Sequence, residues 1–93
     1  MLISADNLLF PLVLRGVQSG DSWRPFGMKG KKKVSDYLTD IKMDSALKKG
    51  LLVLCNGQKR ENPDNIICLP GLEISEYYKV TGESKKLLKI TLL

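Results

Sequence analysis

Residues 24–42 constrain the fold of this chain most, because the hydrophobic pattern changes there from that of a loop to that of a helix. The segment reads RPFGMKGKKKVSDYLTDIK, a basic loop with two glycines that runs directly into an amphipathic sequence. Val34, Leu38 and Ile41 recur at spacings of four and three, with Tyr37 beside them. This spacing predicts a short helix with one face packed on a core.

Capping residues indicate where this helix and a second one begin and end. Ser35 is the expected N-cap of the first helix, and Lys42 suits its C-terminal end. The second helix is predicted to begin at Asp44 and to end at Gly50, with lysines in its last turn. Both helices therefore fall in one part of the chain.

The remaining apolar runs have the length and the flanking turn residues of β-strands. A first strand is expected over Leu8–Arg15, where Pro11 restricts it to a sheet edge or a bend. Leu51–Cys55 and Asn65–Leu69 flank a polar segment, which predicts a hairpin with a long loop over residues 56–64. Beyond it we expect a break at Pro70-Gly71, a less regular segment over Glu73–Val80 and a half-buried last strand over Leu87–Leu93.

Together these elements predict a single domain, residues 1–93, that is mostly β, with one or two short helices inserted after the first strand. The composition, 43% hydrophobic and 27% charged residues, is that of a globular domain. A chain of 93 residues has room for one modest core. No repeat or linker divides it.

The cysteines and the N-terminal segment favour a reducing, cytoplasmic location. Cys55 and Cys68 each lie within an apolar run, so we expect buried free thiols. Met1–Leu14 has no basic start and is interrupted by Asp6, Asn7 and Pro11. It therefore resembles neither a signal peptide nor a membrane-spanning helix, and no membrane partner is expected.

The sequence offers no constellation for catalysis or metal binding. It has no histidine, which excludes Ser–His and Cys–His pairs and histidine metal sites. Asp36 and Asp40 lie one helical turn apart, and a solvated surface pair is favoured over an acid–base pair. Gly27-Met28-Lys29-Gly30 does not fit a P-loop, and its GXXG spacing lacks the preceding helix of a KH domain. We expect no catalytic residue, no metal and no cofactor in this domain.

The basic loop suits a polyanion such as an RNA backbone. The net charge is +5, and four lysines fall within residues 29–33. A lysine run is most often a solvated face, but here it follows two glycines whose backbone N–H groups are open to an anion. We expect Lys31 to be a bystander. The predicted RNA-binding residues are Arg24, Lys29, Gly30, Lys32 and Lys33.

Two aromatic residues flank Arg24 in this loop. Trp23 and Phe26 have the chemistry to stack on exposed bases, but the favoured interpretation is that they fix the loop to the core. Tyr77 and Tyr78 are equally ambiguous, because one ring must face inward if their segment is a strand.

The order and spacing of the loop residues closely resemble a known family. The motif comprises Gly20-Asp21, Arg24-Pro25, Gly27-Met28-Lys29-Gly30 and Lys32-Lys33-Val34-Ser35-Asp36. It resembles the signature of the C-terminal domain of bacterial tRNA(Ile)-lysidine synthetase, the ligase that attaches lysine to the wobble cytidine of an isoleucine tRNA. The resemblance extends over roughly residues 10–86. It includes Leu51-Leu52-Val53-Leu54, Pro70-Gly71-Leu72, Ile74 and Lys79-Val80-Thr81.

This resemblance implies a β-sandwich-like fold, related to a domain of the phenylalanyl-tRNA synthetase β-subunit. Two residues depart from the family pattern, Cys68 where tryptophan is frequent and Glu73 where arginine is common. The Ser-Gly-Gly-x-Asp-Ser motif of the ATP-binding catalytic domain is missing from the chain.

The resemblance therefore implies a non-catalytic, C-terminal tRNA-binding domain of a longer enzyme. A separate catalytic domain of the same polypeptide is its expected partner, with ATP bound there. The alternative is a structural or dimerisation module of that enzyme with little RNA contact, and a homodimer is left open.

Overall fold

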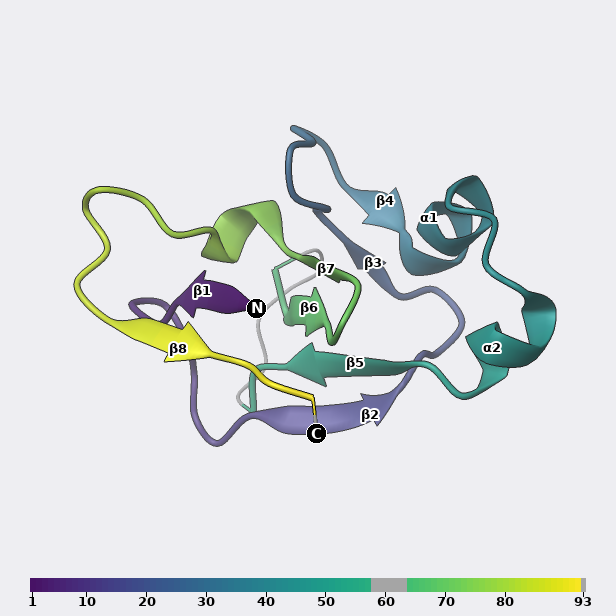
Figure 1. The fold of residues 1–93 in the computed structure, drawn as a ribbon, viewed down its shortest axis with the longest axis horizontal. Coiled ribbons are helices and arrows are strands. Elements are labelled where there is room, and N and C mark those ends of the chain that lie inside the picture. The colour runs from purple at the N-terminus through teal and green to yellow at the C-terminus, as the bar shows by residue number, and fades with distance from the viewer. Residues whose placement is uncertain (58–63, 93) are drawn as a thin grey trace.

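The computed structural model describes residues 1–57 and 64–92, which form a central antiparallel sheet covered on both faces (Figure 1). The central sheet has the strand order β2-β5-β6-β7, and two further strand pairs, β1–β8 and β3–β4, lie on either side of it. The strands are β1 (Leu2–Ser4), β2 (Val13–Gly16), β3 (Ser22–Trp23), β4 (Lys32–Lys33), β5 (Leu52–Cys55), β6 (Ile66–Leu69), β7 (Glu73–Ile74) and β8 (Leu87–Lys89).

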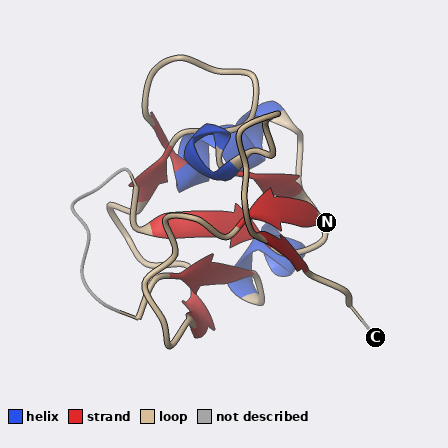
Figure 2. Ribbon diagram, turned by 90° about the vertical axis from the view of Figure 1, so that its left-hand side faces the viewer, coloured by secondary structure: helices blue, strands red, loops and turns tan. Residues whose placement is uncertain are grey.

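The helical segments are short. The two α-helices lie where the sequence places them, after the first strands, whereas the 3-10 turn falls in the segment over Glu73–Val80 for which no helix was predicted. They are α1 (Val34–Asp40), α2 (Ser45–Lys49) and the 3-10 turn η1 (Glu76–Tyr78). The domain is thus mostly β, as predicted (Figure 2).

Burial of β6 on both faces divides the core into two clusters. On one face, Ile66 and Leu69 pack with Trp23 of β3 and with Val34 and Leu38 of α1. The opposite cluster joins β6 to β1 and η1 through Ile3, Ile67, Cys68 and Tyr78. Each face of the central sheet therefore has its own cover.

The first strand is the largest departure from the prediction. Pairing in β2 begins only at Val13, five residues after the predicted start at Leu8, and β1 was not expected. The Leu9 N–H donates instead to Asn56 Oδ1 at 2.8 Å, and the Leu9 carbonyl accepts from Gly57 N at 2.9 Å. These bonds take the backbone before β2 out of the sheet. The predicted edge position of β2 is confirmed.

The first helix is confirmed, with corrected ends. Its N-cap position belongs to Lys33, whereas Ser35 lies inside the helix. The reason is that the Val34 N–H donates to the Asp21 carbonyl at 2.9 Å, so the helix continues directly from the β3–β4 pair. Ile41 is 44% exposed instead of buried, and Lys42 lies beyond the helix with a φ of 58°.

The predicted second helix and the β5–β6 hairpin are confirmed. In α2, Asp44 accepts a hydrogen bond from Ala46 N at 2.8 Å, and Gly50 holds the C-cap position. The hairpin of β5 and β6 is antiparallel as expected. Residues 58–63 of its predicted loop, 56–64, lie outside the described residues, as does Leu93. The last strand, predicted over Leu87–Leu93, ends at Lys89 as β8. Both cysteines are buried free thiols, and burial raises the pKa of Cys68 to about 11.

Buried Leu38 provides a test of the α1 register. Leu38→Asp places a charge in a site that is 2% exposed, so we expect the free energy of unfolding to fall by at least about 3 kcal/mol in urea titrations. The matched control Leu47→Asp changes a side chain that is 66% exposed and is expected to stay close to the parent. Equal unfolding midpoints for the two variants would contradict this packing.

A second test concerns Gly57, which touches the segment before β2. A Cβ atom there would lie 1.5 Å from the Pro11 carbonyl oxygen, a backbone atom that moves only with the chain. We therefore expect Gly57→Ala to destabilise the domain by more than about 1 kcal/mol in thermal and urea unfolding. Gly82→Ala is the control, because a Cβ there meets nothing within 4 Å. A neutral Gly57→Ala would show that the two segments do not approach this closely.

Candidate nucleic-acid interface

The basic loop is the connection of the β3–β4 pair, and a buried tryptophan holds that pair to the core. Ser22 faces Lys33 and Trp23 faces Lys32 across the pair. Trp23 is fully buried, and its ring meets Tyr37 of α1 edge-on, with centroids 5.3 Å apart. The inner end of the loop is therefore anchored, as the sequence predicted for Trp23.

The turn at residues 25–28 is fixed by backbone hydrogen bonds. Met28 N donates to the Pro25 carbonyl at 3.0 Å, and Gly27 has a φ of 85°, the arrangement of a type II turn. Phe26 N donates to the Ile74 carbonyl at 3.0 Å, which ties the turn to β7. Phe26 is nevertheless 50% exposed, so the prediction that its ring fixes the loop to the core is wrong. Its backbone does so instead.

A shallow hollow of about 380 Å³ opens beside this pair. Three consecutive lysines line it, together with a glycine of the turn before β3 and the hydroxyl-bearing first residue of β3. The lining residues are Gly20, Ser22, Lys31, Lys32, Lys33 and Asp36.

The structure distributes the predicted RNA-binding residues unequally. Lys32 and Lys33 lie in β4 and line the hollow, and Lys32 also forms an ion pair with Asp40 of α1. Lys29 and Gly30 lie in the exposed loop before β4. Lys31, which the sequence indicated as a bystander to RNA, also lines the hollow, and its role toward RNA stays a prediction. The signal that would have found it is spacing, because residues two apart in an extended segment share a side.

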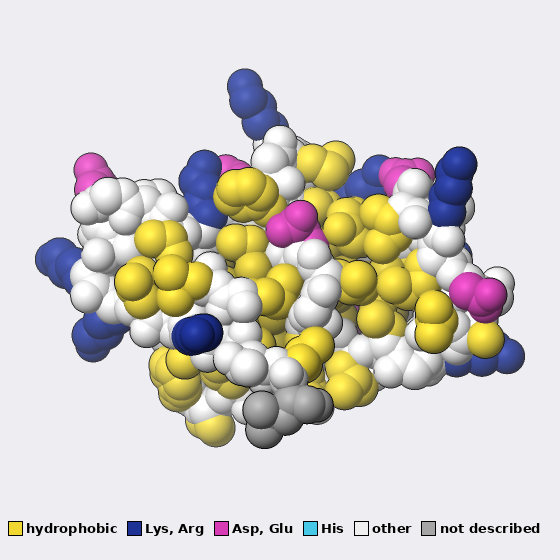
Figure 3. All heavy atoms as spheres, viewed as in Figure 1, with side chains coloured by type: hydrophobic (Ala, Val, Ile, Leu, Met, Phe, Trp, Pro, Cys, Tyr) yellow, Lys and Arg dark blue, Asp and Glu magenta, His cyan; other side chains and the backbone are white. Residues whose placement is uncertain are grey.

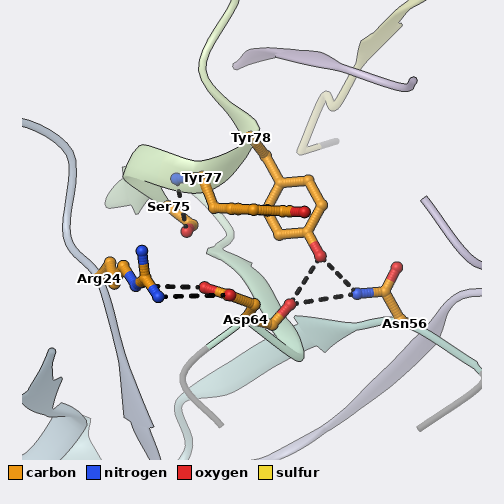
Figure 4. A network of polar contacts seen from close by, with 6 residues as sticks. All are labelled: Arg24, Asn56, Asp64, Ser75, Tyr77 and Tyr78. Carbon is orange, nitrogen blue, oxygen red and sulfur yellow. Dashed lines mark hydrogen bonds and ion pairs between the residues drawn. The ribbon is translucent and has the colours of Figure 1, made fainter. Parts of the chain in front are cut away.

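Arg24 lies apart from the hollow, in a polar network beneath the turn (Figure 4). Its Nε atom is 3.3 Å from Asp64 Oδ1, and its carbonyl accepts from Glu76 N at 2.7 Å. The Asp64 carbonyl accepts from the Tyr78 hydroxyl at 2.6 Å, and that hydroxyl accepts from Asn56 Nδ2 at 2.7 Å. Arg24 therefore has a structural role, joining the loop to η1 and the β5–β6 hairpin.

Asp21 positions the turn before β3, which contributes Gly20 to the lining of the hollow. Its carboxylate accepts two hydrogen bonds from the Arg15 guanidinium, at 2.9 and 3.0 Å, and one from Gln18 N at 2.7 Å. Burial raises the pKa of Asp21, but the Arg15 and Gln18 hydrogen bonds outweigh it and leave this pKa below its ordinary value. The turn is thus held by a charged group.

Neither a metal site nor a membrane span is found in residues 1–57 and 64–92. No three His, Cys, Asp or Glu side chains gather there to hold a metal ion. None of the helices in those residues has the length and apolar character needed to cross a membrane.

Comparison with known proteins gives relatives in sequence and in structure, although no family model matches the chain. The chain is 36% identical over 88 residues to the tRNA(Ile)-lysidine synthase of Parabacteroides distasonis, covering 95% of this chain and 19% of the synthase. For the tRNA(Ile)-lysidine synthase of Clostridium acetobutylicum the identity is 31% over 86 residues, covering 92% and 17%. The synthase of Bacteroides thetaiotaomicron is 49% identical over 55 residues, covering 59% and 13%.

In structure, the chain matches the crystal structure of the TILS C-terminal domain with a TM-score of 0.72 at 19% identity, covering 92% of this chain and 62% of that chain. The chain belongs with the C-terminal domain of tRNA(Ile)-lysidine synthase. The resemblance and the fold class indicated by the sequence are therefore confirmed. The chain spans less than a fifth of the length of these synthases, and their catalytic part lies outside the matched domain.

The charge on Asp21 makes the stability of this synthase domain depend on pH. Because the folded-state pKa lies below the unfolded value of 3.8, the stabilisation is complete above that pH and is lost as the pH falls through the folded pKa. We expect Asp21→Asn to lower the free energy of unfolding by about 1–3 kcal/mol at neutral pH in urea titrations.

The same titration at about pH 3 is the control, where protonation of Asp21 in the parent begins to remove the difference. A difference between parent and Asp21→Asn that is the same at both pH values would contradict the assigned charge.

Proposed function

We propose that this domain binds tRNA without catalysing its modification, and that it positions isoleucine tRNA for ATP-dependent lysidine formation at the wobble cytidine by a separate catalytic domain. The observation that carries the proposal is the hollow beside β3 and β4, where Lys31, Lys32 and Lys33 meet Ser22. Homology to tRNA(Ile)-lysidine synthases supports tRNA as the polyanion.

The lysines of the hollow contribute unequally to the proposed site. Lys31 and Lys33 are two residues apart in an extended segment, so their ammonium groups serve the same side. Lys32 forms an ion pair with Asp40, which weakens the attraction of its ammonium group for a phosphate. Asp36 also lines the hollow and opposes an anion. We therefore assign the main phosphate contacts to Lys31 and Lys33.

The exposed loop extends this site. Lys29 and Gly30 are exposed in the loop that joins β3 to β4. Their ammonium group and open backbone can contact an RNA strand that extends beyond the hollow. A Cβ at Gly30 would meet nothing within 4 Å, so the backbone there is accessible. Arg24 can bind a phosphate only through a guanidinium that is already paired with Asp64.

An apolar hollow on another part of the domain favours the alternative, a structural module that contacts the rest of the synthase. It has a volume of about 430 Å³ and lies between α2 and the turn after β6, where Leu47 and Leu92 are exposed. The much greater length of the relatives supplies chain for such a contact. Unlike RNA binding, this role requires no local positive field.

The two functions are separated by a titration of labelled isoleucine tRNA at several salt concentrations. If Lys31 and Lys33 contact phosphates, the affinity falls with salt, with a log–log slope of about −0.7 to −0.9 per contact. We expect Lys31→Ala and Lys33→Ala each to weaken binding and to reduce the slope by roughly one unit, without a change in melting temperature. Lys85→Ala and Lys86→Ala, at exposed positions before β8, are the controls.

Asp40→Asn tests the proposed inequality of the lysines, because removing this carboxylate frees Lys32 and should tighten binding. Binding that is indifferent to salt would remove the phosphate contacts from the proposal. Equal losses from the Lys85 and Lys86 variants would replace the site with diffuse attraction, and the structural module would then be preferred.

A further inference from the structure

Phe26 is an aromatic side chain displayed at the tip of the basic loop. It occupies the second position of the type II turn and is 50% exposed, while the neighbouring Trp23 and Pro25 are buried. The chain has one other phenylalanine, Phe10, which is 56% exposed and precedes β2. Figure 1 places the β3–β4 turn at the top of the view and β2 at the bottom.

The turn holds the Phe26 ring on a rigid base. Its backbone N–H is bonded to Ile74 O, and the next N–H, of Gly27, donates to Glu76 Oε1 at 3.0 Å. Glu76 is itself paired with Lys79, and a bridge joins Pro25 to Ser75. A ring presented on a backbone fixed in this way loses little conformational entropy when it meets a ligand.

The loop that carries the ring is rich in lysine. Lys29 and Lys31 follow it in the same exposed loop, and Figure 3 shows basic and hydrophobic side chains side by side over the β3–β4 turn. A flat apolar surface next to ammonium groups is complementary to one chemical unit in particular, a nucleotide with an unstacked base and a phosphate.

We propose that Phe26 stacks on an unpaired base of the bound RNA while the lysines of the hollow hold the adjoining phosphates. The inference rests on the proposed function and adds a requirement to it. Bases inside a duplex are already stacked on one another, so the ligand at this loop includes a single-stranded nucleotide beside the phosphates. An apolar protein partner for the same ring is the competing outcome.

The experiment compares three RNA probes that share one stem: a blunt hairpin, the hairpin with a short single-stranded 3′ overhang, and the same overhang built from abasic nucleotides. The abasic probe keeps the phosphates and removes the bases. We expect the parent domain to prefer the overhang with bases. Phe26→Leu keeps the apolar bulk without a π face and should lose roughly tenfold for that probe only.

Matched variants make the result specific. Phe10→Leu should bind all three probes as the parent does, since Phe10 precedes β2 and is not part of the lysine loop. Phe26→Trp should bind as tightly as the parent or more tightly, and its exposed indole should be quenched by the overhang with bases and not by the abasic one. The fully buried Trp23 provides a constant background in both proteins.

The failures are distinguishable. Should Phe26→Leu match the parent on every probe while Lys31→Ala and Lys33→Ala still weaken binding, stacking is overturned and the proposed function stands. A loss by Phe26→Leu that is equal for all three probes also overturns stacking, because the bases then contribute nothing. If no probe and no tRNA binds in a salt-dependent way, the proposed function itself fails.

Discussion

The burial of β6 on both faces is the constraint on which the rest of this structure depends. All four of its residues, Ile66–Leu69, are fully buried, and such a strand is stable only when apolar groups cover it on two sides. One cover comes from β1 and η1, and the other from β3 and α1. Sequence segments before and after the hairpin must therefore fold against it together.

The candidate site results from the way β3 and α1 cover one face of β6. Trp23 points into the core and fixes the inner side of the β3–β4 pair. The outer side of the pair and its connecting loop are left to solvent. Lysines placed there are solvated and need no ion-pair partner. Among the lysines that line the hollow, Lys32 has such a partner within residues 1–57 and 64–92, namely Asp40. The chemistry of the loop is thus separated from the packing that holds it.

The sequence predicted the elements whose pattern is local. The stripe of Val34 and Leu38, the caps Asp44 and Gly50 and the β5–β6 hairpin all depend on neighbours within a few residues. Motif spacing also identified the family, and with it the fold class.

Contacts between distant segments were not predictable in this way. β1 is three residues long and pairs with β8 at the other end of the chain, so no local pattern marks it. The helix begins at Val34 because of the distant Asp21 carbonyl, which removed the need for the Ser35 cap. The Lys32–Asp40 and Arg24–Asp64 ion pairs likewise require the folded chain, and they change which cations remain available in the site.

The bonds that hold the turn at Phe26 also set an order of events during synthesis. They come from Ile74 and Glu76, about fifty residues later in the chain. A ribosome that has made the lysine loop has therefore not yet made the residues that shape it. The loop acquires its rigid form only after residues 73–78 have emerged and packed. In an unfinished chain the lysine loop lacks these bonds, so its fixed shape is reserved for the completed domain.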